Sequence, residues 1–76
     1  MEDIIFEIAS KVLGVNKDSL TIESNRDDIY EWDSLAHLNL IAEMEERLNV
    51  TIPFEEIEDI YSLKDFLKYL DEKNND

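Results

Sequence analysis

The sequence predicts an all-α fold: a small four-helix bundle with three longer helices, one short helix and a long loop between helices 1 and 2. Two observations support this prediction. Apolar residues recur at helical spacing in several separate stretches. The single glycine and the single proline lie between these stretches, where helices are expected to end. Because 76 residues leave room for one small domain, we expect residues 1–76 to form a single unit.

The first helix is predicted over residues 3–13, where apolar positions share one face. Gly14 follows directly and suits the left-handed position that commonly ends a helix. Residues 16–31 are polar and poorly periodic, so we expect a long ordered loop with one short helical turn. A loop of this length in so small a domain is more often functional than idle.

The longest helical pattern covers residues 34–48 and has two apolar faces. The face predicted to lie in the core consists of Leu40, Ile41, Met44 and Leu48. The second face, with acidic residues beside it, consists of Leu35, Leu38 and Ala42, flanked by Glu45 and Glu46. Since a helix in a bundle needs only one buried face, the second face predicts a partner-binding strip with an acidic rim. The alternative is that a four-helix domain buries both faces.

A short third helix is predicted after the extended connector that Thr51, Ile52 and Pro53 form. Phe54, Ile57 and Ile60 recur every three residues among acidic residues, which gives this helix one apolar edge.

The fourth helix is predicted over residues 62–70, with a polar, frayed tail over residues 72–76. Ser62, followed three residues later by Asp65, resembles a capping box with Asp in place of Glu. The inner stripe of this helix is predicted to be Leu63, Phe66, Leu67 and Leu70. We expect all three tyrosines to be half-buried: Tyr30, Tyr61 and Tyr69.

The composition is strongly acidic, and it excludes several classes of function. Seven Lys and Arg residues against 20 Asp and Glu residues give a net charge of −13, which excludes binding to a nucleic-acid backbone and predicts partners with basic patches. The absence of cysteine excludes disulfides and thiolate metal sites. No stretch approaches the roughly 20 apolar residues that span a bilayer. We therefore expect a cytoplasmic monomer without membrane insertion.

Ser34 is the strongest candidate for a functional residue. It follows Asp33 where a loop turns into the second predicted helix, so its hydroxyl lies near free backbone N–H groups and the positive end of a helix dipole. This is a suitable place to hold a phosphate ester. The alternative is that Asp33 and Ser34 are ordinary helix caps.

Catalytic and metal sites are not predicted. Ser34, Asp33 and His37 are the side-chain types of a hydrolytic triad, but they lie within five residues and cannot form its geometry. We expect His37 to have a packing or capping role, because the chain has no cysteine and no second histidine. The carboxylate runs lack the glycine-centred pattern of a calcium loop. We therefore expect a protein that is not an enzyme.

The arrangement of these features resembles an acyl carrier protein over almost the whole chain. Members of that family have a serine in Asp-Ser-Leu at the start of a long helix, a late Glu-Glu pair, an Ile-Pro before a short acidic helix, and a final helix. The matching positions here are Asp33, Ser34, Leu35, Glu45, Glu46, Ile52, Pro53, residues 55–60 and residues 62–70.

The resemblance implies a cofactor, partners and roles for individual residues. A phosphopantetheinyl transferase would join 4′-phosphopantetheine from coenzyme A to Ser34 through a phosphodiester, with Asp33 as part of the motif. Acyl or aminoacyl groups would travel on the arm as thioesters between separate loading and transfer enzymes, in fatty-acid, polyketide or related specialised biosynthesis. The docking surface would be Leu35, Leu38, Ala42, Glu45 and Glu46.

The sequence also departs from the common family pattern next to the serine. Glu31 stands where many fatty-acid carriers have Gly, and Trp32 where they have a small or polar residue. Ala36 and Asn39 replace common acidic residues. These changes indicate a specialised carrier, and Trp32 equally suits a residue that packs the long loop against the bundle. The alternative function is a small acidic helical interaction domain without a prosthetic group.

Overall fold

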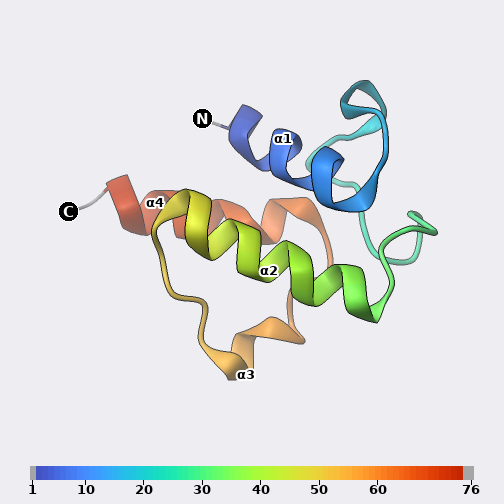
Figure 1. The fold of residues 1–76 in the computed structure, drawn as a ribbon. Helices are drawn as coiled ribbons and strands as arrows, with labels where there is room; N and C mark the ends of the chain where they lie inside the picture. The colour runs from blue at the N-terminus through green and yellow to red at the C-terminus, as the bar shows by residue number, and fades with distance from the viewer. Residues whose placement is uncertain (1, 75–76) are drawn as a thin grey trace.

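The computed structural model describes residues 2–74 and is helical throughout its regular structure (Figure 1). Four α-helices and two short 3₁₀ helices follow one another: α1 (Glu2–Leu13), η1 (Lys17–Ser19), α2 (Ser34–Leu48), α3 (Phe54–Ile57), η2 (Leu63–Phe66) and α4 (Leu67–Asn74). Over the described range the only bridge of β type joins Asn25 to Ser62. The predicted all-α fold with its long loop between α1 and α2 is confirmed.

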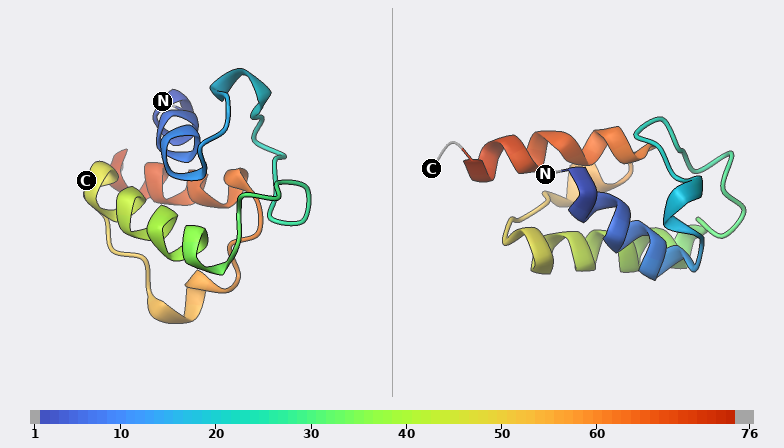
Figure 2. Two further views of the ribbon diagram at one scale, coloured as in Figure 1. Left: turned by 45° about the vertical axis from the view of Figure 1, so that its right-hand side comes forward. Right: turned by 90° about the horizontal axis from the view of Figure 1, so that it is seen from above.

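The helices form a layered bundle (Figure 2). Helices α2 and α4 lie side by side, α1 covers them on one side, and the short α3 lies on the other side. The long loop between α1 and α2 lies at the end of the bundle where α2 begins. None of the helices in the described part of the chain has both the length and the apolar character needed to cross a membrane.

Helix α2 supplies the centre of the core with one face only. Its four core residues are at most 3% exposed: Leu40, Ile41, Met44 and Leu48. They pack among apolar residues of the other helices, including Ile8 of α1 and Phe66 of η2, which are fully buried. On the other face, Leu35 is 70% exposed and Leu38 is 57% exposed. The alternative that both faces are buried is therefore wrong.

The ends of the helices follow the expected local chemistry. Gly14 adopts a φ of 70° directly after α1, and Asn49 adopts a φ of 56° as the left-handed C-cap of α2. Ser62 and Asp65 form the predicted capping box at the start of η2. Burial would raise the pKa of Asp65, but hydrogen bonds from the N–H groups of Ser62 and Tyr61 outweigh it, so this pKa lies below its usual value.

Three expectations about the second half of the chain are corrected. Helix α3 ends at Ile57, and i→i+3 bonds then tighten the backbone, so that Ile60 is buried while Phe54 is 86% exposed. The predicted fourth helix starts as a 3₁₀ turn because the capping box holds its first residues in a tight turn. The α-helix continues to Asn74, so residues 72–74 of the predicted frayed tail are helical, while residues 75–76 lie outside the described range.

The prediction that all three tyrosines are half-buried is wrong, and Tyr61 is 46% exposed. Tyr30 is 95% exposed on the loop, and Tyr69 is 1% exposed. Tyr69 can be buried because its hydroxyl donates a hydrogen bond to Glu56 (2.5 Å), which gives its polar tip a partner. Burial and this hydrogen bond raise the pKa of Tyr69 to about 12.

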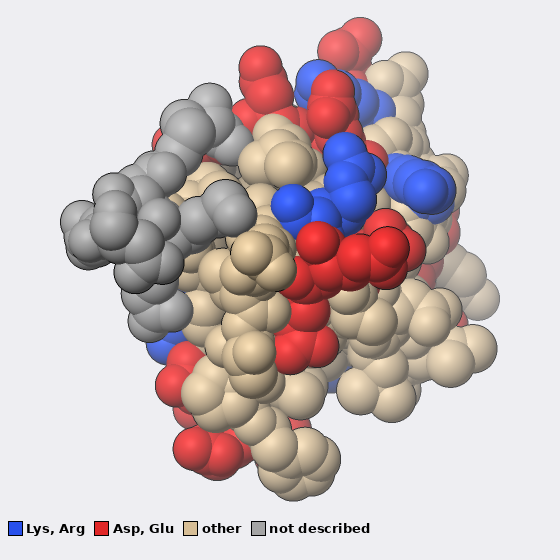
Figure 3. All heavy atoms as spheres, turned by 60° about the vertical axis from the view of Figure 1, so that its left-hand side comes forward, with Lys and Arg blue, Asp and Glu red and all other residues tan. Residues whose placement is uncertain are grey.

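The described surface is acidic, with a few ion pairs that all involve lysine. Figure 3 shows a face on which basic side chains gather against acidic ones. The pairs that join elements of the fold are Lys17 with Glu7 (3.8 Å), Lys64 with Glu23 (3.2 Å) and Lys68 with Glu56 (2.7 Å). Because their side chains are largely exposed, these pairs add little to the free energy of unfolding.

Candidate functional site

Ser34 is the first residue of α2, and Asp33 is the residue that caps the helix. Asp33 has extended backbone angles (φ −91°, ψ −173°), and its carboxylate accepts a hydrogen bond from the N–H of Ala36 (2.8 Å). Ser34 is exposed, and its hydroxyl makes no hydrogen bond to the described side chains (residues 2–70) or backbone (residues 2–74). The capping role therefore falls to Asp33 alone, which leaves the Ser34 hydroxyl available to solvent.

Trp32 and His37 form a buried pair beneath this turn. The indole Nε1–H of Trp32 donates to Nδ1 of His37 (2.9 Å), and the two rings stack with their centroids 6.0 Å apart. An indole nitrogen can only donate, so Nδ1 is unprotonated and His37 Nε2–H donates to the carbonyl oxygen of Ile57 (2.8 Å). The imidazole is therefore neutral and joins α2 to α3. The interpretation that Trp32 packs the long loop against the bundle is confirmed, because Trp32 is 3% exposed.

Burial also acts on the protonation of His37. Desolvation lowers the pKa of this imidazole below its usual value, and the nearby positive charge of Arg26 lowers it further. The hydrogen bond to the Ile57 carbonyl opposes the shift without reversing it.

The geometry excludes a hydrolytic triad at this turn. Both ring nitrogens of His37 are engaged, one by Trp32 and one by the Ile57 carbonyl. The Asp33 carboxylate is engaged by the backbone of α2. Because no base is directed at Ser34, its hydroxyl has no activating partner within the described chain.

Ser34 borders a shallow hollow of about 380 Å³ at the end of the bundle. The hollow brings together residues of the loop, the start of α2 and the turn before η2: Arg26, Asp27, Trp32, Asp33, Ser34 and Tyr61. Patterns in the sequence did not connect Arg26, Asp27 or Tyr61 with the site. No local pattern could have done so, because Tyr61 and Ser34 are brought together only by tertiary packing.

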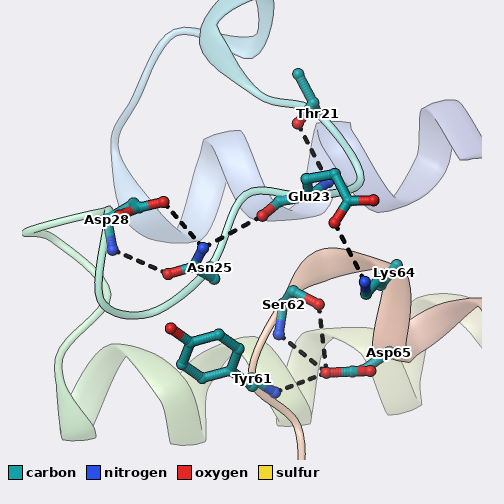
Figure 4. Close-up of polar contacts among 8 residues, drawn as sticks. All are labelled: Thr21, Glu23, Asn25, Asp28, Tyr61, Ser62, Lys64 and Asp65. Carbon is teal, nitrogen blue, oxygen red and sulfur yellow. Dashed lines mark hydrogen bonds and ion pairs between the residues drawn. The ribbon is translucent and has the colours of Figure 1, made fainter.

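The loop wall of this hollow is held by the segment that leads into η2 (Figure 4). The side chain of Asn25 closes a turn by accepting from the N–H groups of Asp27 (3.0 Å) and Asp28 (3.1 Å). The N–H of Arg26 donates to the carbonyl of Tyr61 (3.0 Å). The hydroxyl of Tyr61 donates to Asp27 (2.7 Å), and this bond raises the pKa of Tyr61. The loop is therefore ordered by contacts with a distant segment.

The second face of α2 runs away from Ser34 as an exposed strip. Leu35, Leu38, Ala42 and Glu46 are all exposed. Glu45 differs from the prediction of a simple rim residue, since it is half-buried and its carboxylate accepts a hydrogen bond from the N–H of Ile52 (2.9 Å). Glu45 therefore also holds the connector that follows α2.

The site fits a phosphate ester on Ser34. The hydroxyl is exposed, the first turn of α2 has N–H groups without helical partners, and the helix dipole favours negative charge there. The hollow beside it is open to solvent and includes a guanidinium group. Among the side chains of residues 2–70, which are those the structure describes, no group of three or more His, Asp or Glu residues could hold a metal ion.

Comparisons with known proteins agree with this geometry. A family model described as "Phosphopantetheine attachment site" matches residues 3–70. An acyl carrier protein of Syntrophobacter fumaroxidans (strain DSM 10017 / MPOB) is 39% identical over 70 residues, covering 92% of this chain and 86% of that protein. One of Chlorobium phaeovibrioides (strain DSM 265 / 1930) is 34% identical over 73 residues, covering 96% and 94%.

A third relative extends the agreement to another bacterial genus. The acyl carrier protein of Clostridium perfringens (strain SM101 / Type A) is 38% identical over 72 residues, with 95% of each chain covered. Family model and relatives thus span nearly the whole chain, including α2 and the turn at its start. The chain belongs to the acyl carrier protein family, and its cofactor is covalently attached 4′-phosphopantetheine.

Proposed function

We propose that Ser34 is the residue to which 4′-phosphopantetheine is attached. The observation that carries this proposal is the division of roles at the start of α2. Asp33 caps the helix, and the exposed Ser34 hydroxyl has no hydrogen bond within the described residues. A phosphopantetheinyl transferase would join the Ser34 oxygen to the phosphate of the arm, with coenzyme A as donor. When bound, the arm supplies a terminal thiol that carries acyl or aminoacyl groups as thioesters.

We infer that the chain itself carries and presents its cargo but does no catalysis. His37 is the single histidine of the sequence, and both its ring nitrogens are engaged in internal hydrogen bonds. The chemistry on the thioester then belongs to separate enzymes. Residues 1–76 would act as one carrier unit, as a monomer in the cytoplasm.

The partner surface is proposed to be the exposed strip of α2. Leu35, Leu38 and Ala42 offer apolar contact beside the Ser34 site, and the acidic Glu46 lies next to them. With a net charge of −13, the chain would be steered toward basic patches on the transferase and on loading enzymes. Glu45 contributes less to binding in this proposal, because its carboxylate already holds Ile52.

The pathway is proposed from the surface next to Ser34. Glu31, Ala36 and Asn39 stand at positions where common fatty-acid carriers have other residues. Enzymes of fatty-acid synthesis that bind the surface next to this serine would find different side chains on this chain. We therefore propose that the chain serves a specialised biosynthetic route, with loading by an adenylating ligase as the first activity to assay.

The attachment site can be tested by intact-mass analysis after co-expression with a broad-specificity phosphopantetheinyl transferase. Wild type is expected to gain the mass of one phosphopantetheine group, and Ser34→Ala to gain none. Ser19→Ala is the matched control, since it removes another exposed serine hydroxyl and is expected to be fully modified. Modification of Ser34→Ala, or none on wild type, would refute the proposal.

The docking surface can be tested with Leu38→Ala. We expect the kcat/KM of the transferase to fall about 5- to 10-fold, because an interface leucine that is desolvated on binding contributes on the order of 1 kcal/mol. The free energy of unfolding should change by less than about 0.5 kcal/mol, since Leu38 is exposed in the free chain. Leu38→Met keeps the apolar volume and should restore most of the rate. An unchanged rate for Leu38→Ala would remove Leu38 from the docking surface.

A further inference from the structure

Arg26 is the cation of the hollow beside Ser34. Of the six lining residues, all within the described chain, it is the only basic one. It is half-buried, and among the side chains that the structure describes, those of residues 2–70, no carboxylate lies within 4.0 Å of its guanidinium group. Every ion pair found in this range involves a lysine. The guanidinium group therefore lies at the site without a strong anionic partner.

The two carboxylates that share the hollow are already engaged elsewhere. Asp27 accepts a hydrogen bond from the Tyr61 hydroxyl (2.7 Å). Asp33 accepts the capping bond from the N–H of Ala36 (2.8 Å). Because both carboxylates have these partners, an additional anion at the hollow would find the Arg26 side chain available.

The backbone of Arg26 is held in place at the edge of the hollow. Its N–H donates to the carbonyl of Tyr61 (3.0 Å), and the preceding residue, Asn25, pairs with Ser62. Arg26 lines the same hollow as Asp33 and Ser34, at the start of α2. The fold therefore fixes the backbone from which the Arg26 side chain reaches the hollow.

We propose that Arg26 binds the phosphodiester formed on Ser34 and so holds the root of the phosphopantetheine arm against the loop. This inference rests on the proposed attachment at Ser34. A phosphodiester carries one negative charge and two unesterified oxygens, and the guanidinium fork can donate two parallel N–H bonds to such a group. Phosphate attachment thus supplies the anionic partner that Arg26 lacks, and it adds a contact between α2 and the loop that the unmodified chain does not have.

The direct test is NMR of ¹⁵N-labelled wild type before and after modification with transferase and coenzyme A. The Nε–Hε resonance of Arg26 is expected to shift and to exchange more slowly with solvent in the modified protein. The same resonance of Arg47 is expected to remain in place. Arg47 lies in the last turn of α2, roughly 20 Å along the helix axis from Ser34.

A second measurement compares the thermal midpoint of each variant with and without the arm. Wild type is expected to gain about 2–4 °C more on modification than Arg26→Gln, the shift produced by one partly exposed charge pair in a chain of this size. Arg47→Gln is the matched control, because it makes the same change in net charge and should gain as much as wild type. Arg26→Lys should retain part of the gain, and added NaCl should reduce it.

The outcomes separate this inference from the proposed function. Intact mass confirms attachment in each sample before it is measured. If the modified wild type shows no change at Arg26, or if Arg26→Gln and Arg47→Gln gain equally, Arg26 does not bind the phosphate while attachment at Ser34 stands. If wild type gains no mass, the attachment proposal fails and this inference fails with it. If Arg26→Gln does not fold, the Nε–Hε resonance of Arg26 in wild type, compared before and after modification, still tests whether Arg26 binds the phosphate.

Discussion

His37 is the single side chain that connects the most parts of the site. Its two ring nitrogens join Trp32, which leads into the Ser34 turn, to the backbone of Ile57 in α3. A buried histidine is stable here because each nitrogen has a partner of the right kind, donor for Nδ1 and acceptor for Nε2–H. Protonation of Nδ1 would place two N–H groups opposite each other and break the bond from Trp32. The position of the loop next to Ser34 therefore depends on a neutral imidazole.

This arrangement predicts a pH dependence of stability near neutrality. The pKa of His37 in the folded chain lies below the value of about 6.5 of an unfolded histidine. Between these two values the unfolded chain binds more protons than the folded chain, so the free energy of unfolding rises with pH there. The contribution of His37 to the free energy of unfolding is fully present above about pH 6.5. It is lost as the pH falls through the pKa of His37 in the folded chain.

The measurement is an NMR titration of His37 combined with urea unfolding at pH values on both sides of 6.5. The difference in unfolding free energy between the two pH values should shrink in His37→Gln, which keeps an amide donor for the Ile57 carbonyl but does not titrate. A folded-state pKa at or above 6.5 would contradict this prediction.

Helix α1 and the loop that follows it are determined by different kinds of contact. Gly14 stops α1 in a left-handed conformation, and its N–H donates to the carbonyl of Ser10 (2.9 Å). The loop beyond it has few apolar residues of its own. It is ordered by backbone hydrogen bonds to the segment around the start of η2, and Figure 4 shows the Glu23–Lys64 pair that also joins them. The end of α1 is thus a local matter of backbone conformation, whereas the course of the loop is decided by contacts with a distant segment.

Replacement of Gly14 by Ala is expected to lower the free energy of unfolding by about 1 kcal/mol, or roughly 4–8 °C in thermal midpoint. A Cβ added at this position would meet nothing within 4 Å, so the loss comes from the φ of 70° and not from a clash. Gly14→Asn should lose less, because asparagine tolerates the left-handed region. Equal losses for the two variants would show that the cost is not conformational.

The whole molecule combines a small core with a large negative charge. The described residues include only a few ion pairs on a surface rich in carboxylates, and the net charge of the chain is −13. This excess of negative charge suits brief contacts with basic partners. It also destabilises the folded state, because the carboxylates repel one another. The same negative charges therefore favour binding to basic partners and lower the stability of the folded chain.

The thermal midpoint is accordingly expected to rise with ionic strength. Between about 10 mM and 150 mM salt the screening length falls from roughly 30 Å to about 8 Å, below the 25 Å middle dimension of the molecule. Melts in a NaCl series at pH 7.5 measure the effect, and an equal osmolality of sucrose serves as the uncharged control. A midpoint that stays flat or falls with NaCl would contradict the role given to charge repulsion.

Much of the fold could be predicted from local patterns in the sequence. Helical spacing and end signals placed α1 and α2 within a residue of their observed bounds, and they placed Gly14 and the capping box correctly. The two faces of α2 were also readable, although only packing could decide that one of them stays exposed. The predictions for α3 and for the tyrosines were weaker, because the position of these side chains depends on tertiary packing. Phe54 is exposed to solvent, and Tyr69 lies in the core.

At the site, the sequence by itself determined the kind of position that Ser34 occupies, because Asp-Ser before an amphipathic run encodes a helix start through local hydrogen bonding. The tertiary structure alone decided what surrounds it. Trp32 and His37 meet beneath the turn, and Arg26 and Tyr61 come to the hollow from distant parts of the chain. The physical reason is that caps and helix faces depend on neighbours a few residues away, whereas a hollow depends on which segments pack together across the bundle.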